Sequence, residues 1–135
     1  MRIAIVDDDA AMRVVMNGHC LRYGEERGMH FDVECFSNGD DLLADYRRGR
    51  FAILFLDVEM PGTDGLEVAR RVRRVDDAVT IVFVTNMAQC AIHGYEVAAS
   101  DYIVKPLTYF DFELKLTKAL RLAKGHAETV VSIVT

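Results

Sequence analysis

Six consecutive apolar residues, FAILFL at positions 51–56, lead directly into an aspartate, Asp57. A run without polar alternation is typical of a strand that is covered on both faces, as in a parallel sheet. The run TIVFV at positions 80–84 has the same character. Three further β-type runs complete a set of five predicted strands, at 3–6, 31–36 and 102–104. The second of these alternates in part, which favours a place nearer a sheet edge.

Helical patterns fill the gaps between these strands. Apolar and aromatic residues recur on one face of four predicted helices: Met12, Val15, Met16, His19 and Tyr23; Leu42, Leu43 and Tyr46; Leu66, Ala69 and Val72; and Phe112, Leu116, Ala119, Leu120 and Ala123. Residues 87–95 predict a weaker helix. Residue pairs three apart resemble N-terminal capping pairs at three helix starts: Ser37 with Asp40, Asp64 with Glu67, and Thr108 with Asp111.

The elements follow one another as strand and helix, repeated five times. This order predicts an α/β fold, a doubly wound (βα)5 architecture with a five-stranded parallel sheet and helices on both faces. Right-handed crossovers leave few topologies. By analogy with flavodoxin-like proteins, we expect the strand order 2-1-3-4-5.

Composition excludes several classes of protein. The chain has 135 residues, 51% of them hydrophobic, which fits one domain with a real core. Its net charge of −5 argues against a nucleic-acid surface on this domain. No apolar stretch approaches the roughly 20 residues that span a bilayer, and the N-terminus is not a signal peptide. Cys20, Cys35 and Cys90 lack disulfide or zinc spacing, so we expect reduced, mostly buried thiols in a cytoplasmic protein.

Polar residues follow four of the five predicted strands. Asp7, Asp8 and Asp9 follow the first, Asp57 the third, Thr85 ends the fourth, and Lys105 follows the fifth. Ligands of parallel α/β sheets sit at these strand ends, where the strand order reverses. Converging carboxylates repel each other, and a hard cation with oxygen ligands, best Mg²⁺, would relieve the repulsion.

This set of side chains predicts phosphoryl chemistry. An aspartate beside Mg²⁺ can attack phosphorus and form an acyl phosphate. Thr85 could donate a hydrogen bond to the transferred group, and Lys105 could neutralise its charge. Taken singly, each residue has a simpler interpretation: Asp9 is well placed to cap a helix, Thr85 could cap the next one, and Lys105 could be a solvated loop lysine. Their coincidence at successive strand ends favours a site.

Four segments resemble motifs of the receiver domains of two-component response regulators: IAIVDDD at 3–9, LFLDVEMPGTDG at 54–65, FVT at 83–85 and DYIVKPL at 101–107. The resemblance covers residues 1–123. The Asp57 stretch and the Lys105-Pro106 pair are very specific together.

The resemblance implies a role for each matching residue. Asp57 would take a phosphoryl group from a histidine kinase, while Asp8, Asp57 and the backbone carbonyl of Glu59 would bind Mg²⁺, with Asp7 acting through water. Lys105 would contact the phosphoryl group, and its bond to Pro106 would be cis. Thr85 and Tyr102 would form a coupled switch pair. The domain would be a phosphoacceptor with self-phosphorylation and autodephosphorylation chemistry, not a turnover enzyme.

A finer resemblance concerns the output. Residues 83–102 look like those of regulators that carry a LytTR DNA-binding domain, so we expect transcription control through DNA binding by a missing C-terminal domain. Residues 124–135 would be a linker or the start of that domain, with an extended run over 128–135. The face formed by residues 88–122 would mediate homodimerisation on phosphorylation. A stand-alone or protein-interaction receiver is the alternative. Glu59 and Met87 occupy positions where receivers vary, and Asn86 is larger than the small residue that many receivers carry there. These departures leave the phosphoryl lifetime and the access of the donor open.

Three other functions compete with this interpretation. A phosphatase of the haloacid dehalogenase type also uses an aspartate after a strand, but it needs a second aspartate where this chain has Glu59. A flavodoxin-like or nucleotide-binding module lacks support because no glycine-rich phosphate loop is present. A pseudo-receiver that signals without phosphate is disfavoured by the intact residue set. The arginines at 70, 71, 73 and 74 are interpreted as a solvated face paired with Glu67, Asp76 and Asp77.

Overall fold

A computed structural model of the chain describes residues 1–86 and 99–134, with side chains as far as Gly125. The strands are β1 (Arg2–Val6), β2 (Asp32–Phe36), β3 (Ile53–Asp57), β4 (Thr80–Thr85) and β5 (Asp101–Val104). The helices in this part of the chain are α1 (Ala10–Arg27), α2 (Gly39–Ala44), α3 (Gly65–Val75) and α5 (Tyr109–Val134). The helix predicted over 87–95 lies outside the described residues.

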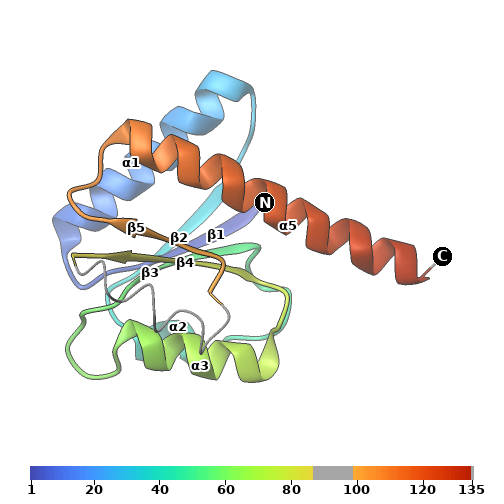
Figure 1. Ribbon diagram of the computed structural model, residues 1–135. Coiled ribbons are helices and arrows are strands. Elements are labelled where there is room, and N and C mark those ends of the chain that lie inside the picture. The colour runs from blue at the N-terminus through green and yellow to red at the C-terminus, as the bar shows by residue number, and fades with distance from the viewer. Residues whose placement is uncertain (87–98, 135) are drawn as a thin grey trace.

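The sheet has the predicted topology. All four strand pairings are parallel, and the order is β2-β1-β3-β4-β5, with β2 at an edge. Helices α1 and α5 cover one face, while α2 and α3 cover the other (Figure 1). The side chains of β3 divide between two cores: Ile53 and Phe55 pack on the α1/α5 side, and Leu54 and Leu56 on the α2/α3 side. Every residue of β3 is buried, which explains its unbroken apolar sequence.

Three of the predicted helix caps are confirmed and one is displaced. A carboxylate oxygen of Asp9 accepts from the N–H of Ala11 at the start of α1, and Asp64 accepts from the N–H of Glu67 at the start of α3. Thr108 accepts from the N–H of Asp111 in the same way. The start of α2 is capped by Asn38 and not by Ser37, because the Asn38 side chain accepts from the N–H of Asp41, three residues on.

Two predictions of side-chain burial are wrong. Val15, placed on the buried stripe of α1, is 41% exposed, because α1 buries only the narrower face of Met16, Cys20, Tyr23 and Gly24. Cys20 is buried as predicted, whereas Cys35 is exposed on the edge strand β2. Cys90 lies outside the described residues.

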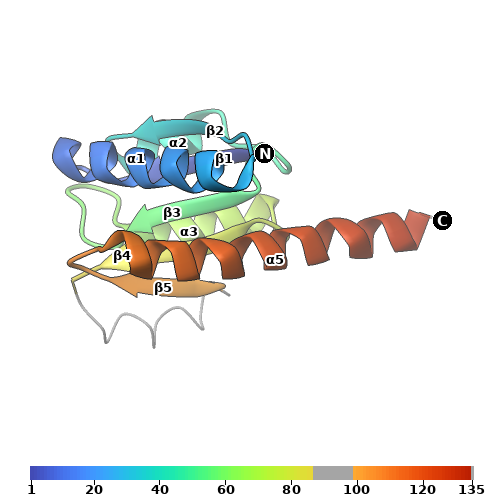
Figure 2. The same cartoon turned by 90° about the horizontal axis from the view of Figure 1, so that it is seen from above.

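The C-terminal segment is helical and not extended. Residues 128–134 continue α5 to Val134, so the predicted extended run is wrong. A preformed helix adds each further residue at low cost, which outweighs the β-preference of valine, isoleucine and threonine here. Figure 2 shows α5 projecting past the end of the sheet where the strands begin.

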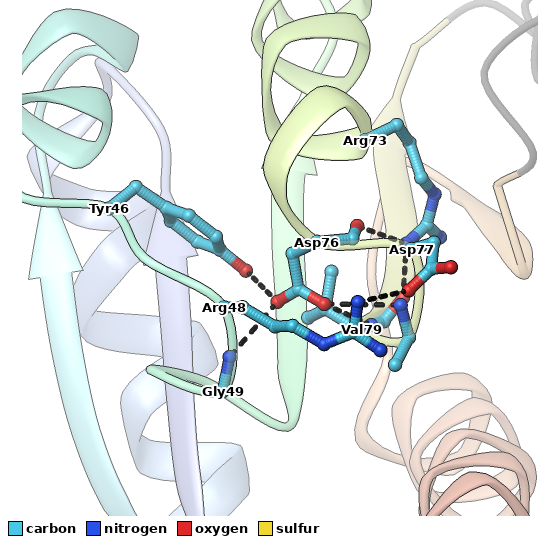
Figure 3. Close-up of polar contacts among 8 residues, drawn as sticks. Tyr46, Arg48, Gly49, Arg73, Asp76, Asp77 and Val79 are labelled. Carbon is cyan, nitrogen blue, oxygen red and sulfur yellow. Dashed lines mark hydrogen bonds and ion pairs between the residues drawn. The ribbon is translucent and has the colours of Figure 1, made fainter.

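A buried aspartate joins two loops, α2–β3 and α3–β4, at the end of the sheet where the strands begin (Figure 3). Asp76, 2% exposed, accepts from the Tyr46 hydroxyl at 2.8 Å and from the N–H groups of Ala78 and Val79 at 3.1 and 3.2 Å. Arg73 donates to the Val79 carbonyl at 2.7 Å. Arg73 is therefore half-buried in this network and is not part of a solvated face.

The remaining arginines of α3 fit the solvated-face prediction in part. Arg70 and Arg71 each lie 3.2 Å from Glu67. Asp77 pairs with Arg48 of the α2–β3 loop, at 3.0 Å. The acids on this face thus divide between structural and surface roles.

Candidate functional site

The carboxyl ends of the central strands bring the predicted residues together. Val6 of β1 lies level with Leu56 of β3, and Asp57 lies level with Val84 of β4. Asp7 and Asp8 directly follow β1, so their side chains meet Asp57 at the carboxyl ends of these strands. Carboxylate oxygens of Asp7, Asp8 and Asp57 all lie within 4.8 Å of one another.

Asp7 is the most constrained of the three acids. It is 1% exposed, and its two carboxylate oxygens accept from the N–H of Asp9 at 2.9 Å and from the ammonium of Lys105 at 3.2 Å. Its backbone N–H donates to the carbonyl of Phe36 in β2. Its carbonyl accepts from the guanidinium of Arg13 at 2.7 Å. Every polar group of Asp7 therefore has a protein partner.

Asp8 differs from Asp7 in both exposure and contacts. Its side chain is exposed, and within residues 1–86 and 99–125 its carboxylate has no hydrogen-bond or ion-pair partner. A carboxylate beside two other acids, directed at solvent and free of protein donors, is available to bind a cation.

Asp57 is buried, with 6% of the residue exposed, and its surroundings disfavour the ionised carboxylate. Its burial, followed by the negative charge of Asp7, raises the pKa of Asp57 to about 6. Lys105, 3.6 Å from an Asp57 oxygen, and the N–H of Glu59 act in the opposite direction but do not cancel these effects. The site holds three carboxyl groups and one ammonium, so its donor set fits a hard divalent ion such as Mg²⁺.

Lys105 is held at the site by its backbone as well as by its side chain. Its N–H donates to the Thr85 carbonyl at 2.8 Å, and its bond to Pro106 is cis. Thr85, at the end of β4, is completely buried. Lys105, directly after β5, thus reaches the acid cluster with its side chain while its backbone is held to the end of β4.

Tyr102 lies apart from the acids. It is level with Phe83, two residues before Val104, the register partner of Thr85. Its side chain is 37% exposed, and the ammonium of Lys115 lies 5.3 Å from its ring centroid. In this structure, Tyr102 is exposed on the surface of β5.

Two residues that shape the site had no predicted role. Gly65 lies against the backbone of Asp57, so closely that a Cβ at Gly65 would be 2.9 Å from the Asp57 carbonyl carbon. Arg13 anchors the Asp7 carbonyl. The available signal for Gly65 was a glycine directly after a capping aspartate, and for Arg13 a cation shortly after the start of a helix, where it is unfavourable.

Within the described residues, no helix is both long and apolar enough to cross a membrane.

Comparisons with known proteins identify the family of this chain. The family described as "Response regulator receiver domain" matches residues 3–119. The transcriptional regulatory protein ResD of Bacillus subtilis is 34% identical over 124 residues, which cover 90% of this chain and 49% of ResD. The sensory transduction protein LytT of Oceanobacillus iheyensis is 34% identical over 83 residues, 60% of this chain and 34% of LytT. The chain thus matches about half the length of ResD and about a third of the length of LytT.

A solved structure gives a similar result. The response regulator protein TrrA from Thermotoga maritima, determined in complex with Mg²⁺ and a beryllium fluoride, matches with a TM-score of 0.74 and 26% identity over 87% of this chain and 97% of that one. The fold and the acid cluster define a receiver module of two-component signalling. The chain belongs to the response regulator receiver domain family.

Proposed function

We propose that Asp57 accepts a phosphoryl group from a sensor histidine kinase and so switches a regulatory output. The observation that carries this proposal is the buried Asp57 carboxylate, within 4.8 Å of those of Asp7 and Asp8 and 3.6 Å from the Lys105 ammonium. A carboxylate oxygen of Asp57 attacks phosphorus, and the bond from phosphorus to the donor histidine nitrogen breaks.

Mg²⁺ is the proposed cofactor. Asp8 and Asp57 would bind it directly, with the carbonyl of Glu59, while Asp7 would act through water. The contrast between the two neighbouring acids supports this assignment, because Asp7 already has a protein partner for each carboxylate oxygen and Asp8 has none in the described part of the chain. When bound, the ion would neutralise charge on the phosphoryl oxygens.

The remaining side chains would stabilise the transferred group. The Lys105 ammonium already lies between Asp7 and Asp57, so a small movement would let it contact a phosphoryl oxygen on Asp57. Thr85, at the neighbouring strand end, would donate its hydroxyl to the same group. Tyr102, exposed in this structure, would turn inward as Thr85 moves, and this change at β5 and α5 would promote homodimerisation.

We propose transcription control as the output, in a cytoplasmic regulator. ResD is named a transcriptional regulatory protein, and this chain matches only its receiver-sized half. A LytTR DNA-binding domain beyond Thr135 is the proposed form of this output, on the sequence resemblance of residues 83–102, and the sensory transduction protein LytT is a partial relative. The alternatives are an output domain of another type and a stand-alone receiver, and the coding sequence downstream of Thr135 discriminates among these three.

Acetyl phosphate with Mg²⁺, followed by intact mass spectrometry, tests the phosphoacceptor role. The wild-type chain should gain one phosphoryl group, and Asp57→Asn should gain none. No gain by the wild type would favour a pseudo-receiver. Steady turnover of a generic phosphate ester would instead support a phosphatase. Sedimentation with and without beryllofluoride tests dimerisation, and an unchanged monomer would refute it.

A further inference from the structure

Arg13 holds the peptide unit that precedes the acid most open to a cation. Its guanidinium donates to the Asp7 carbonyl at 2.7 Å. That oxygen belongs to the same planar unit as the N–H and Cα of Asp8, because the peptide bond does not rotate freely. Fixing the oxygen therefore fixes the plane from which the Asp8 side chain projects.

This indirect restraint matters because the Asp8 carboxylate has no direct one within residues 1–86 and 99–125. In the part of the chain whose side chains are described, no donor contacts the Asp8 carboxylate, and the side chain is exposed. Asp7, one residue earlier, is clamped by Asp9, Lys105 and Phe36. The Arg13 contact extends this clamp to the Asp7–Asp8 peptide.

The position of Arg13 is unfavourable for a residue with only a helical role. It lies four residues past the Asp9 cap of α1, near the positive end of the helix dipole, and the first turn holds no acidic residue. A cation here also brings positive charge toward a proposed Mg²⁺ site. The adjacent acids attract the same charge in the metal-free protein, so the geometry of the Arg13 contact with the Asp7 carbonyl is what carries the inference.

We propose that Arg13 is a positioning residue for the cation site: it orients Asp8 through the Asp7–Asp8 peptide and so raises the affinity for Mg²⁺. This inference rests on the proposed function only for the identity of the ion. The sign of the change in Mg²⁺ affinity when Arg13 is removed tests it, because two effects of Arg13 oppose each other. Orientation by Arg13 strengthens Mg²⁺ binding, whereas its charge alone weakens it.

Isothermal titration with Mg²⁺ alone tests the inference without any phosphorylation step. Arg13→Ala should bind Mg²⁺ about tenfold more weakly, the lower end of what loss of an outer partner costs a metal site. Arg13→Lys, which keeps a cation and a donor, should restore part of this loss. Arg22→Ala is the matched control on the same helix, because Arg22 pairs with Glu26, and its affinity should equal that of the wild type.

A second readout separates positioning from general damage to the fold. The unfolding temperature in EDTA should change little in Arg13→Ala, while the Mg²⁺ concentration for half-maximal phosphorylation by acetyl phosphate rises and the maximal rate stays near that of the wild type. Unchanged or tighter Mg²⁺ binding by Arg13→Ala would overturn the inference. If the wild type binds Mg²⁺ but is never phosphorylated, the proposed function fails while the titration still decides the role of Arg13.

Discussion

Gly65 lies directly against the backbone of the proposed phosphoacceptor, Asp57. A Cβ built on Gly65 would overlap the Asp57 carbonyl oxygen and lie 2.9 Å from both the Asp57 carbonyl carbon and the Val58 Cα. The contacted atoms are backbone, so no side-chain rotation can relieve the overlap. The first turn of α3 therefore fixes the end of β3, and with it the direction of the Asp57 carboxylate.

Gly65→Ala should displace Asp57. We expect a loss of about 1–3 kcal/mol in the free energy of unfolding, as for other overpacked positions. The acetyl phosphate reaction should slow by at least about tenfold, because small misplacements of a nucleophile are costly. Urea denaturation and intact mass measured over time check the two effects.

Gly18→Ala is the control for this substitution. Gly18 lies within α1, and a Cβ there would meet nothing within 4 Å. This variant should gain about 0.5–1 kcal/mol of stability from helix propensity and keep the wild-type phosphorylation rate. Equal phosphorylation rates in both glycine variants would contradict the role assigned to Gly65.

Asp57→Asn should stabilise the metal-free protein at neutral pH. The pKa of Asp57 is raised from its ordinary 3.8 to about 6, so the folded state holds this proton more tightly than the unfolded chain does. The wild type therefore loses stability as pH rises from about 4 to about 6, and above that range the whole cost remains. Asparagine does not titrate and escapes this cost.

Denaturation in EDTA at several pH values measures this difference. At pH 7, Asp57→Asn should be more stable than the wild type by on the order of 2 kcal/mol, and the two proteins should converge near pH 4. A difference that is constant with pH would show that ionisation of Asp57 is not its cause.

Lys105→Met should weaken the metal-free fold. Lys105 lies 3.2 Å from Asp7 and 3.6 Å from Asp57, and its side chain is only 12% exposed. Removing it leaves two buried acids without their cation, for which we expect a loss of about 2–4 kcal/mol. Saturating Mg²⁺ should recover part of this loss, since a divalent ion neutralises the same carboxylates.

Thermal unfolding with and without Mg²⁺ checks this prediction. The temperature gain on adding Mg²⁺ should be larger for Lys105→Met than for the wild type. Lys118→Met is the matched control: Lys118 is 55% exposed and pairs with Asp101 at 3.4 Å, so its loss should cost at most about 0.5 kcal/mol. A smaller Mg²⁺ effect in Lys105→Met would show that the ammonium and the ion do not neutralise the same acids.

Asp76→Ala should destabilise the fold without changing the phosphorylation chemistry. Asp76 accepts hydrogen bonds from Tyr46, Ala78 and Val79 (Figure 3). These contacts lie at the end of the sheet where the strands begin, opposite the acid cluster. Its loss leaves several buried donors without partners, which should cost about 2–4 kcal/mol. Tyr46→Phe removes one of these bonds and should cost about 1–2 kcal/mol.

Urea denaturation checks these values, and Asp77→Ala is the control. Asp77 is 76% exposed and pairs with Arg48, so its loss should cost at most about 0.5 kcal/mol. Folded Asp76→Ala should gain a phosphoryl group from acetyl phosphate at the wild-type rate. A slower reaction in the folded variant would reveal coupling between the two edges of the sheet.

The sequence by itself determined the strands, most helix starts and the set of residues at the strand ends. The unbroken apolar run before Asp57 implies burial on both faces, and such a strand needs helices on each side. Capping by Asp9, Asp64 and Thr108 was equally readable, because donor and acceptor lie two or three residues apart. The locations of Asp7, Asp57, Thr85 and Lys105 followed from parallel strands ending at one edge.

Only the tertiary structure decided how those residues divide their contacts. Asp7 and Lys105 are 98 residues apart in sequence, and nothing local indicates that the Lys105 ammonium lies between Asp7 and Asp57 while Asp8 stays free of protein donors in the described part of the chain. The burial of Asp76 against Tyr46, and the approach of Gly65 to Asp57, likewise depend on how loops meet in space. Helical periodicity and helix caps depend on residues that are close in sequence, whereas the partners of a buried charge depend on the packing of the whole fold.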